Sequence, residues 1–232
     1  MKIEIWTDFA FPFCYIGKKR FEQALDNFHG KDKVEVIYKS FILVPDAPKE
    51  TNLSAIEELA KSKGIPKEQA KMSYEHVVRM AKTENLEYNL DTIKAVSTND
   101  AHRLMQWAKS FGKERELSTA LFDGYFVTGK NLAHYNTLAE IALSVGLDPK
   151  KAREVLEFDQ YLDLVEKDIS DASMLGVQSV PTFVVNREYG VSGAQREEYF
   201  TKMLEEAYQE MYPSKLKITK DDSACGPDGC DI

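Results

Sequence analysis

The stretch TDFAFPFCYIGKKRF (Thr7–Phe21) stands where a strand pattern gives way to a helix pattern. Proline is common in the first turn of a helix, so we expect a helix to begin at Pro12. A cysteine there is usually chemical, because the free backbone N–H groups and the positive end of the helix dipole stabilise a thiolate. The cysteine in this turn is Cys14. Phe11 stands where a polar cap is expected, and this departure governs the functional interpretation.

The segments on either side of this stretch predict a strand, a helix and a second strand. Residues Lys2–Asp8 alternate in polarity, which indicates a strand. The apolar spacing after Pro12 predicts a helix that ends at Gly30. Val34–Phe41 is rich in β-branched and aromatic residues and predicts the second strand. Two strands joined by a helix within about 40 residues are typical of a parallel βαβ unit.

The middle of the chain, from Thr51 to about Leu175, shows helix patterns in series and no convincing strand. Most of these patterns end at a glycine or another turn signal, as C-terminal caps do. Seven helices are too many for one face of a two-strand unit, so we expect a separate helical subdomain. The expected helices are Ser54–Lys63, Pro66–Glu84, Asn99–Phe111, Glu114–Val127, Leu132–Val145, Pro149–Glu157 and Tyr161–Leu175.

Strand character returns near the end of the chain. Ser179–Asn186 predicts a strand with a proline near its start, and Arg187–Gly193 predicts its hairpin partner. Ala194–Met211 predicts a closing amphipathic helix. Its expected apolar stripe consists of Tyr199, Met203, Ala207 and Met211.

The order of these elements predicts an α/β thioredoxin-like fold, βαβ followed by ββα, with a large all-helical insertion. The expected thioredoxin-like domain comprises residues 1–50 and 176–212. Residues 51–175 form the insertion, and residues 213–232 form a polar tail that carries a Cys-x4-Cys pair.

Composition and charge exclude several classes of protein. The chain has 232 residues, 43% hydrophobic and 29% charged, which is ordinary for a globular protein. A formal charge of -8 offers nucleic-acid phosphates no basic stripe. The start of the chain shows no secretory-signal pattern, and no apolar run reaches the roughly 20 residues of a membrane helix. We therefore expect a cytoplasmic protein without nucleic-acid or membrane partners, whose three cysteines are not a structural disulfide framework.

The segment DFAFPFCYIGKKRFE resembles the active site of the DsbA-like thiol–disulfide oxidoreductases, in particular their FrnE-like branch, where the motif is typically DxxCPWCYIGK. SVPTFVVN resembles the family's cis-proline segment, which implies that Pro181 is that proline. Further stretches resemble the family as well: NDAHRLMQWAK, which contains His102; GAQ at residues 193–195; and the ACGPDGC of the tail. The resemblance covers nearly the whole chain. It implies a thioredoxin fold and redox activity on protein thiols and disulfides or on a small thiol such as glutathione, without a cofactor or a metal.

The chain departs from the family at the most important position. Family members attack with the first cysteine of the motif, and Phe11 occupies that position. A phenylalanine has no acidic proton and no redox chemistry. The resemblance gives Cys14 the role of the resolving cysteine. The alternative is that Cys14 is a core thiol with a raised pKa and little reactivity, which the absence of its partner favours.

The tail supplies a second dithiol, Cys225 and Cys230. The residues between them, GPDG, favour a turn that would bring the two thiols towards bridging distance. Closing so short a loop stabilises a fold weakly, so the pair suits redox exchange. A zinc site is the competing interpretation, and two cysteines supply only half of a structural zinc site.

The expected substrate contacts are Pro12, Phe13, Val180 and Pro181, because an apolar rim beside a proline-started strand can hold an extended peptide. The sequence thus favours a thiol–disulfide oxidoreductase of reduced or altered activity, working through the tail pair with Cys14. A polypeptide-binding or adaptor protein on the same fold is the second hypothesis. A kappa-type glutathione transferase or isomerase is the third, weakened because Phe11 lacks the hydroxyl that such proteins carry.

Overall fold

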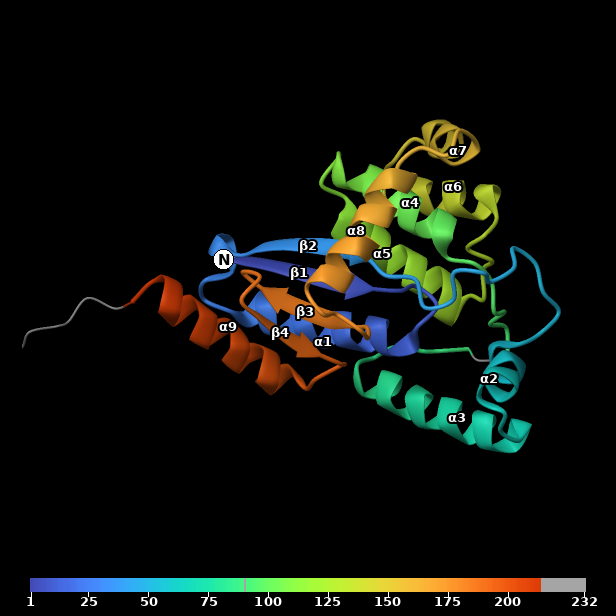
Figure 1. The fold of residues 1–232 in the computed structure, drawn as a ribbon, viewed down its shortest axis with the longest axis horizontal. Coiled ribbons are helices and arrows are strands. Elements are labelled where there is room, and N and C mark those ends of the chain that lie inside the picture. Colours follow the sequence, from blue (N-terminus) through green and yellow to red (C-terminus); the bar gives the residue numbers. More distant parts are fainter. Residues whose placement is uncertain (90, 214–232) are drawn as a thin grey trace, which may run out of the picture.

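A four-stranded sheet forms the centre of the molecule (Figure 1). The computed structural model describes residues 1–89 and 91–213. The strands are β1 (Lys2–Thr7), β2 (Glu35–Ser40), β3 (Thr182–Val185) and β4 (Tyr189–Ser192), in the order β2-β1-β3-β4. β1 pairs with β2 in parallel and with β3 in antiparallel orientation, and β3 pairs with β4 in antiparallel orientation. The parallel βαβ unit and the C-terminal hairpin that the sequence predicts are both confirmed.

Helices cover both faces of this sheet (Figure 1). α1 (Pro12–Asn27) and α9 (Glu197–Met211) pack against each other on one face. A short 3-10 turn follows α1 and leads into β2. On the opposite face lies α8 (Leu162–Met174), where the indole Nε1 of Trp6 donates a hydrogen bond of 2.9 Å to the Asp168 carbonyl oxygen. Side chains of a strand alternate between faces, so β1 contributes to both layers.

The apolar stripe predicted for α9 is wrong at both ends. Tyr199 is 51% exposed and Met211 is 44% exposed. The residues that α9 does bury are Phe200, Met203, Leu204 and Ala207. Phe200 stacks edge-on against Phe183 at a ring-centroid distance of 4.6 Å, so contact with β3 decides which of two adjacent apolar rows faces inward.

The segment between β2 and β3 is helical throughout its described regular structure and forms two groups (Figure 1). The first group is a hairpin of two helices, α2 and α3, which lies beside the start of α1. The second group, α4 to α8, lies on the other side of the sheet. The bounds are α2 Ala55–Lys63, α3 Lys67–Thr83, α4 Asn99–Lys109, α5 Glu114–Phe122, α6 Tyr135–Ser144, α7 Pro149–Glu157 and α8 Leu162–Met174.

The helix that the sequence predicts from Glu114 to Val127 changes character inside that range. The α-helix ends at Phe122, and a π-helical turn, Asp123–Val127, follows it. The backbone N–H of Thr128 closes this turn on the Asp123 carbonyl oxygen at 3.0 Å. Hydrophobic spacing does not distinguish a wider turn from an α-helical one, so the sequence could not reveal it.

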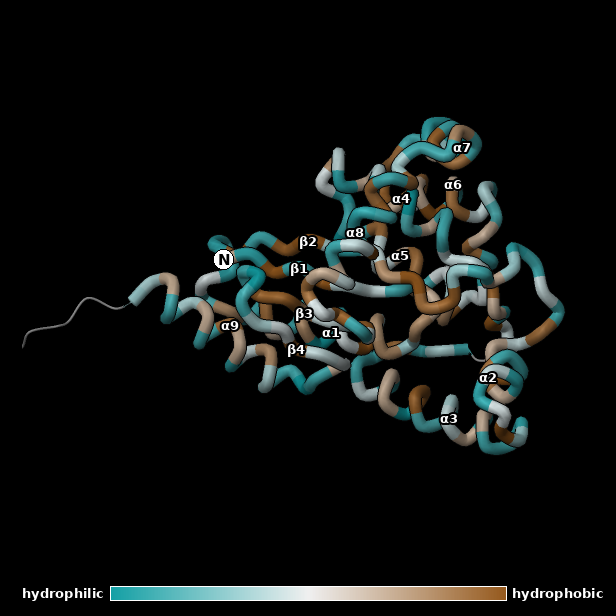
Figure 2. The backbone as a smooth tube through the Cα atoms, in the orientation of Figure 1, coloured by the Kyte–Doolittle hydropathy of each residue, from teal (hydrophilic) through white to brown (hydrophobic). Residues whose placement is uncertain are grey.

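Hydrophobic residues concentrate in the strands of the sheet, as the brown segments of β1, β2 and β3 show (Figure 2). The core between the sheet and α1 contains the rings of Phe21, Phe183 and Phe200, each with 0% exposure. In the described part of the chain, none of the helices has the length and apolar character needed to cross a membrane. The division of the chain into a thioredoxin-like domain and an insertion domain stays a prediction.

Candidate functional site

α1 begins at Pro12, as the sequence predicts, and Phe11 is its N-cap residue. The Phe11 backbone is extended, with φ -103° and ψ 113°, and its side chain makes no capping hydrogen bond. The Phe11 carbonyl oxygen accepts a bond of 2.9 Å from the backbone N–H of Cys14. The half-buried Phe11 ring therefore occupies the entrance to the helix, where a polar group would normally interact with the free N–H groups.

The thiol of Cys14 lies inside this first turn and is shielded from solvent. Its side chain is 1% exposed, and its Sγ accepts a hydrogen bond of 3.5 Å from the backbone N–H of Asp8. Burial raises the pKa of the Cys14 thiol to about 12. Among the described residues it is the one cysteine, and it is not bonded to another. A protonated, buried thiol is a poor nucleophile.

The carboxylate of Asp8, at the end of β1, is the main polar group behind Phe11. Its oxygens accept hydrogen bonds from the Thr98 hydroxyl at 2.8 Å and from the backbone N–H groups of Leu43 and Ala10 at 2.8 and 3.1 Å. Burial alone would raise the pKa of this carboxyl, but the His102 imidazole and the two N–H groups hold it below its ordinary value. Nε2 of His102 lies 3.7 Å from the carboxylate and has no hydrogen-bond partner among the residues that the structure describes.

The peptide bond between Val180 and Pro181 is cis, which confirms the proline conformation that the family resemblance implies. This segment packs closely on α1. A Cβ atom on Gly17 would lie 2.9 Å from Cγ of Pro181 and 3.3 Å from Cα of Ala194, so only glycine fits there without displacement. The backbone N–H and C=O of Val180 make no hydrogen bond to other described residues.

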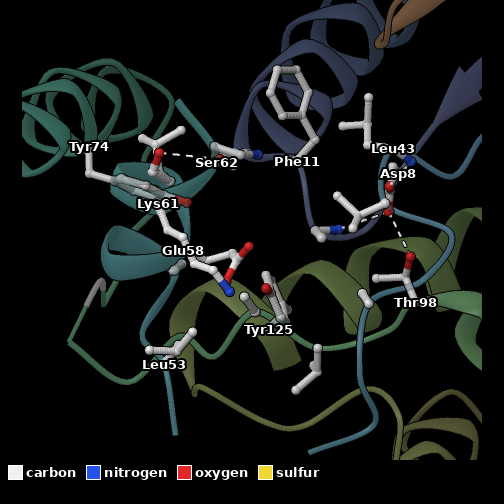
Figure 3. Close-up of a pocket in the computed structure, with 18 of the residues that line it drawn as sticks. Asp8, Phe11, Leu43, Leu53, Glu58, Lys61, Ser62, Tyr74, Thr98 and Tyr125 are labelled. Atoms are coloured by element: carbon white, nitrogen blue, oxygen red, sulfur yellow. Dashed lines mark hydrogen bonds between the residues drawn. The ribbon is translucent and has the colours of Figure 1, made fainter. Parts of the chain in front are cut away.

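A large pocket of about 1020 Å³ opens beside Phe11, between the start of α1, the loop after β2 and the α2–α3 hairpin (Figure 3). The rings of Phe11 and Phe13 lie 5.4 Å apart on its wall. Most of its other lining is apolar, and Tyr125 lies at its base. Further apolar lining residues are Leu43, Val44, Leu59 and Met72. Its size and lining are those of a ligand-binding site.

The structure brings some of the predicted site residues together and leaves others apart. Phe11, Pro12 and Phe13 line the pocket, whereas Val180 and Pro181 are not among its lining residues. Cys225 and Cys230 lie outside the described residues. Within the described ranges, no group of three or more His, Cys, Asp or Glu side chains could hold a metal ion.

Sequence reasoning missed the residues that surround the start of α1. Asp8 stands at the first position of the motif and Thr98 shortly before α4, but neither was singled out. The α2–α3 hairpin also contributes to the site, and nothing in its sequence marked it as functional. The motif spacing could have directed attention to Asp8, whereas the position of the hairpin depends on tertiary packing.

The sheet order, the helix that begins with a cysteine in its first turn, and the cis proline packed against that helix define a thioredoxin-fold protein with helical additions. The model of the DSBA-like thioredoxin domain matches residues 2–205. The chain belongs to this family of DsbA-like thiol–disulfide oxidoreductases.

Individual proteins resemble this chain in sequence or structure over most of its length. The crystal structure of a probable DsbA oxidoreductase from Streptomyces coelicolor is 38% identical, with a TM-score of 0.84, and the match covers 100% of this chain and 99% of that one. YwbO, an uncharacterized protein of Bacillus subtilis, is 27% identical over 204 residues, which is 87% of this chain and 94% of YwbO. The cytosolic disulfide reductase DsbM from Pseudomonas aeruginosa shares the fold at 14% identity and a TM-score of 0.64, over 90% of this chain and 100% of DsbM.

Proposed function

We propose that this protein is a DsbA-like oxidoreductase of reduced activity, in which the start of α1 binds polypeptide but does not attack disulfides. The main support is the state of Cys14, which is 1% exposed and whose pKa burial raises to about 12. In addition, Phe11 occupies the position of the family nucleophile. A thiol–disulfide exchange needs an accessible thiolate to begin. Phe11 and Phe13 instead offer apolar contact at the wall of the large pocket.

We assign the reduced thiol–disulfide exchange activity of this protein to the tail pair, Cys225 and Cys230. In this proposal the thiolate of Cys225 or Cys230 attacks a substrate disulfide and forms a mixed disulfide. The second tail thiol then displaces the substrate thiol, so the substrate disulfide gains two electrons and two protons and the tail pair becomes a disulfide. Two molecules of a small thiol such as glutathione return the pair to the dithiol and become a disulfide themselves. The DsbM structure, which was solved with GSH, shares the fold and supports a small thiol as the partner.

Turnover of a model protein disulfide by the full chain tests this assignment. We expect slow reduction of insulin in the presence of glutathione, and loss of that activity in the Cys225→Ser/Cys230→Ser variant. The Cys14→Ser variant is the matched control and should keep the wild-type rate, because its thiol is buried. If the tail variant keeps its activity and Cys14→Ser loses it, the assignment is wrong.

A polypeptide-binding protein without redox chemistry is the second candidate, and the pocket of about 1020 Å³ beside Phe11 favours it. Binding of an unfolded polypeptide would then not depend on any thiol. Isothermal titration with a reduced, alkylated protein compares wild type with the variant that carries serine at Cys14, Cys225 and Cys230. Unchanged affinity together with absent turnover in the wild type supports this second candidate. Loss of binding in the triple variant contradicts it.

A further inference from the structure

We infer that the pocket selects polypeptide segments that carry a basic side chain among large apolar ones, and that Glu58 receives the basic group. This inference rests on the proposed polypeptide binding and deepens it. Glu58 is placed by α2, a helix of the segment between β2 and β3 that is remote in sequence from the cysteine motif. Figure 3 shows its side chain extending into the pocket, which Phe11 and Tyr125 also line.

The carboxylate of Glu58 is without an internal partner. The side chain is half-buried and makes neither a hydrogen bond nor an ion pair with any other described residue. Its neighbour Glu57 is engaged differently: it closes the capping box with Ser54 and pairs with Lys67 at 2.8 Å. Capping of α2 therefore does not need Glu58. A carboxylate that lines an apolar pocket without a partner is a recognition group for a cation.

The charges of the whole pocket favour a cationic ligand. Its acidic lining residues are Asp8, Asp46 and Glu58, and its basic ones are Lys61 and His76. The hydrogen-bonded Asp8 carboxylate is enclosed behind Phe11, so Asp46 and Glu58 are the acids available to a ligand. Lys61 is exposed and offsets one of them. When formal charges are counted without histidine, as in the value of -8 for the chain, the accessible lining carries a net negative charge.

The apolar wall of the pocket suits a polypeptide that carries large apolar side chains beside its basic one. Phe11 and Phe13 come from the start of α1, Leu43 and Val44 from the loop after β2, and Met72, which is 61% exposed, from α3. Aromatic rings and an unbranched methionine adapt to varied apolar side chains. The stem of a lysine or arginine can lie along such a surface while its charged end reaches a carboxylate. The pocket thus combines an apolar wall with a carboxylate, Glu58, that can bind the cation.

Matched peptides test the inference by fluorescence anisotropy. One labelled peptide contains phenylalanine, leucine and lysine, and the other has glutamate in place of each lysine. We expect wild type to prefer the lysine peptide, and Glu58→Gln to weaken that peptide about two- to fivefold, as for a partly exposed ion pair. Glu58→Lys should reverse the preference. Glu68→Gln is the control, because Glu68 is an exposed acid in the first turn of the neighbouring helix and does not line the pocket.

The outcomes separate this inference from the proposed function. If both peptides bind wild type and Glu58→Lys leaves their ratio unchanged, the inference is overturned and polypeptide binding stands. If neither peptide binds wild type, polypeptide binding and the inference both fall. If Glu58→Gln and Glu68→Gln weaken binding of the lysine peptide equally, the effect is one of general charge. That result also overturns the role of Glu58. Far-UV circular dichroism of each variant confirms that α2 is intact.

Discussion

The two ends of β1 differ in how fully their buried polar groups are hydrogen-bonded. At the beginning of the strand, Glu4 is 2% exposed and its carboxylate is held by two bonds from Arg187, at 2.8 and 3.0 Å, with Lys39 at 3.8 Å. At the end of the strand, the Asp8 carboxylate accepts three hydrogen bonds, but the neighbouring thiol of Cys14 accepts only one long bond from a backbone N–H. Nε2 of His102, beside them, has no hydrogen-bond partner among the described residues.

This difference separates stabilising from functional polar groups. Buried polar groups in folded proteins are normally hydrogen-bonded, and those at the beginning of β1 follow that rule. Groups that do not follow it concentrate where a protein binds or reacts. The end of β1 meets the start of α1 and the large pocket, so the less satisfied end is the one that faces the candidate site.

The largest expected effect concerns the thiol of Cys14. A pKa of about 12, raised by burial from an ordinary value of 9.0, leaves about a thousandfold less thiolate at neutral pH. Alkylation of the folded protein with iodoacetamide, followed by mass spectrometry, should label Cys14 about a thousandfold more slowly than in the chain unfolded in guanidinium. Equal rates in the folded and unfolded chain would show that the end of β1 is open, and the contrast between the two ends would be lost.

A smaller effect is expected at the beginning of β1. Arg187→Ala removes two bonds from the buried Glu4 carboxylate and one from Asp171, and should lower the free energy of unfolding by about 1–3 kcal/mol. The lower part of that range applies because the guanidinium is 46% exposed. Denaturant unfolding measures it. Arg79→Ala, a change at an exposed arginine on α3, is the control and should have little effect. Equal stabilities of the two variants would contradict the pairing.

The smallest expected effect is a change in how the free energy of unfolding depends on pH under acidic conditions. Burial raises the pKa of Asp171, but hydrogen bonds from Arg187 and Lys39 outweigh it and leave that pKa below its ordinary value. The unfolded carboxyl titrates near pH 3.9, so this stabilisation is complete above about pH 5 and is lost as the pH falls through the folded pKa. Arg187→Ala should flatten this loss between about pH 4 and pH 2. If the free energy of unfolding falls equally with pH in the variant and in wild type, Asp171 does not contribute to the acid dependence of stability.

The sequence predicted the sheet and most helices because their signals are local. The alternation in β1, the proline before Cys14 and the hairpin before α9 are each readable within a few residues. The buried row of α9 was not predictable, because Tyr199 and Phe200 both continue a helical apolar spacing and only contact with Phe183 distinguishes them.

The candidate site was predictable only where it overlaps the motif. Phe11, Pro12 and Phe13 follow from the spacing around Cys14 and line the pocket, whereas Val180 and Pro181 do not, and the substrate contacts stay a prediction. Glu58 and Tyr125 come from helices that the sequence marks as ordinary amphipathic segments. Both residues line the same pocket because of how the α2–α3 hairpin and the π-helical turn after α5 pack near the start of α1, and that packing is tertiary information.

The most direct test of the account is turnover of a model disulfide by wild type and by Phe11→Cys, side by side. A thiol at the start of α1 would face the free N–H groups of the first turn, with Cys14 three residues behind it to resolve the mixed disulfide. The rate should rise about a hundredfold or more. Phe13→Cys, which places a thiol at an equally half-buried position on the same rim, should leave the rate near that of wild type. Equal rates for wild type and Phe11→Cys would contradict the claim that Phe11 occupies the position of the attacking residue.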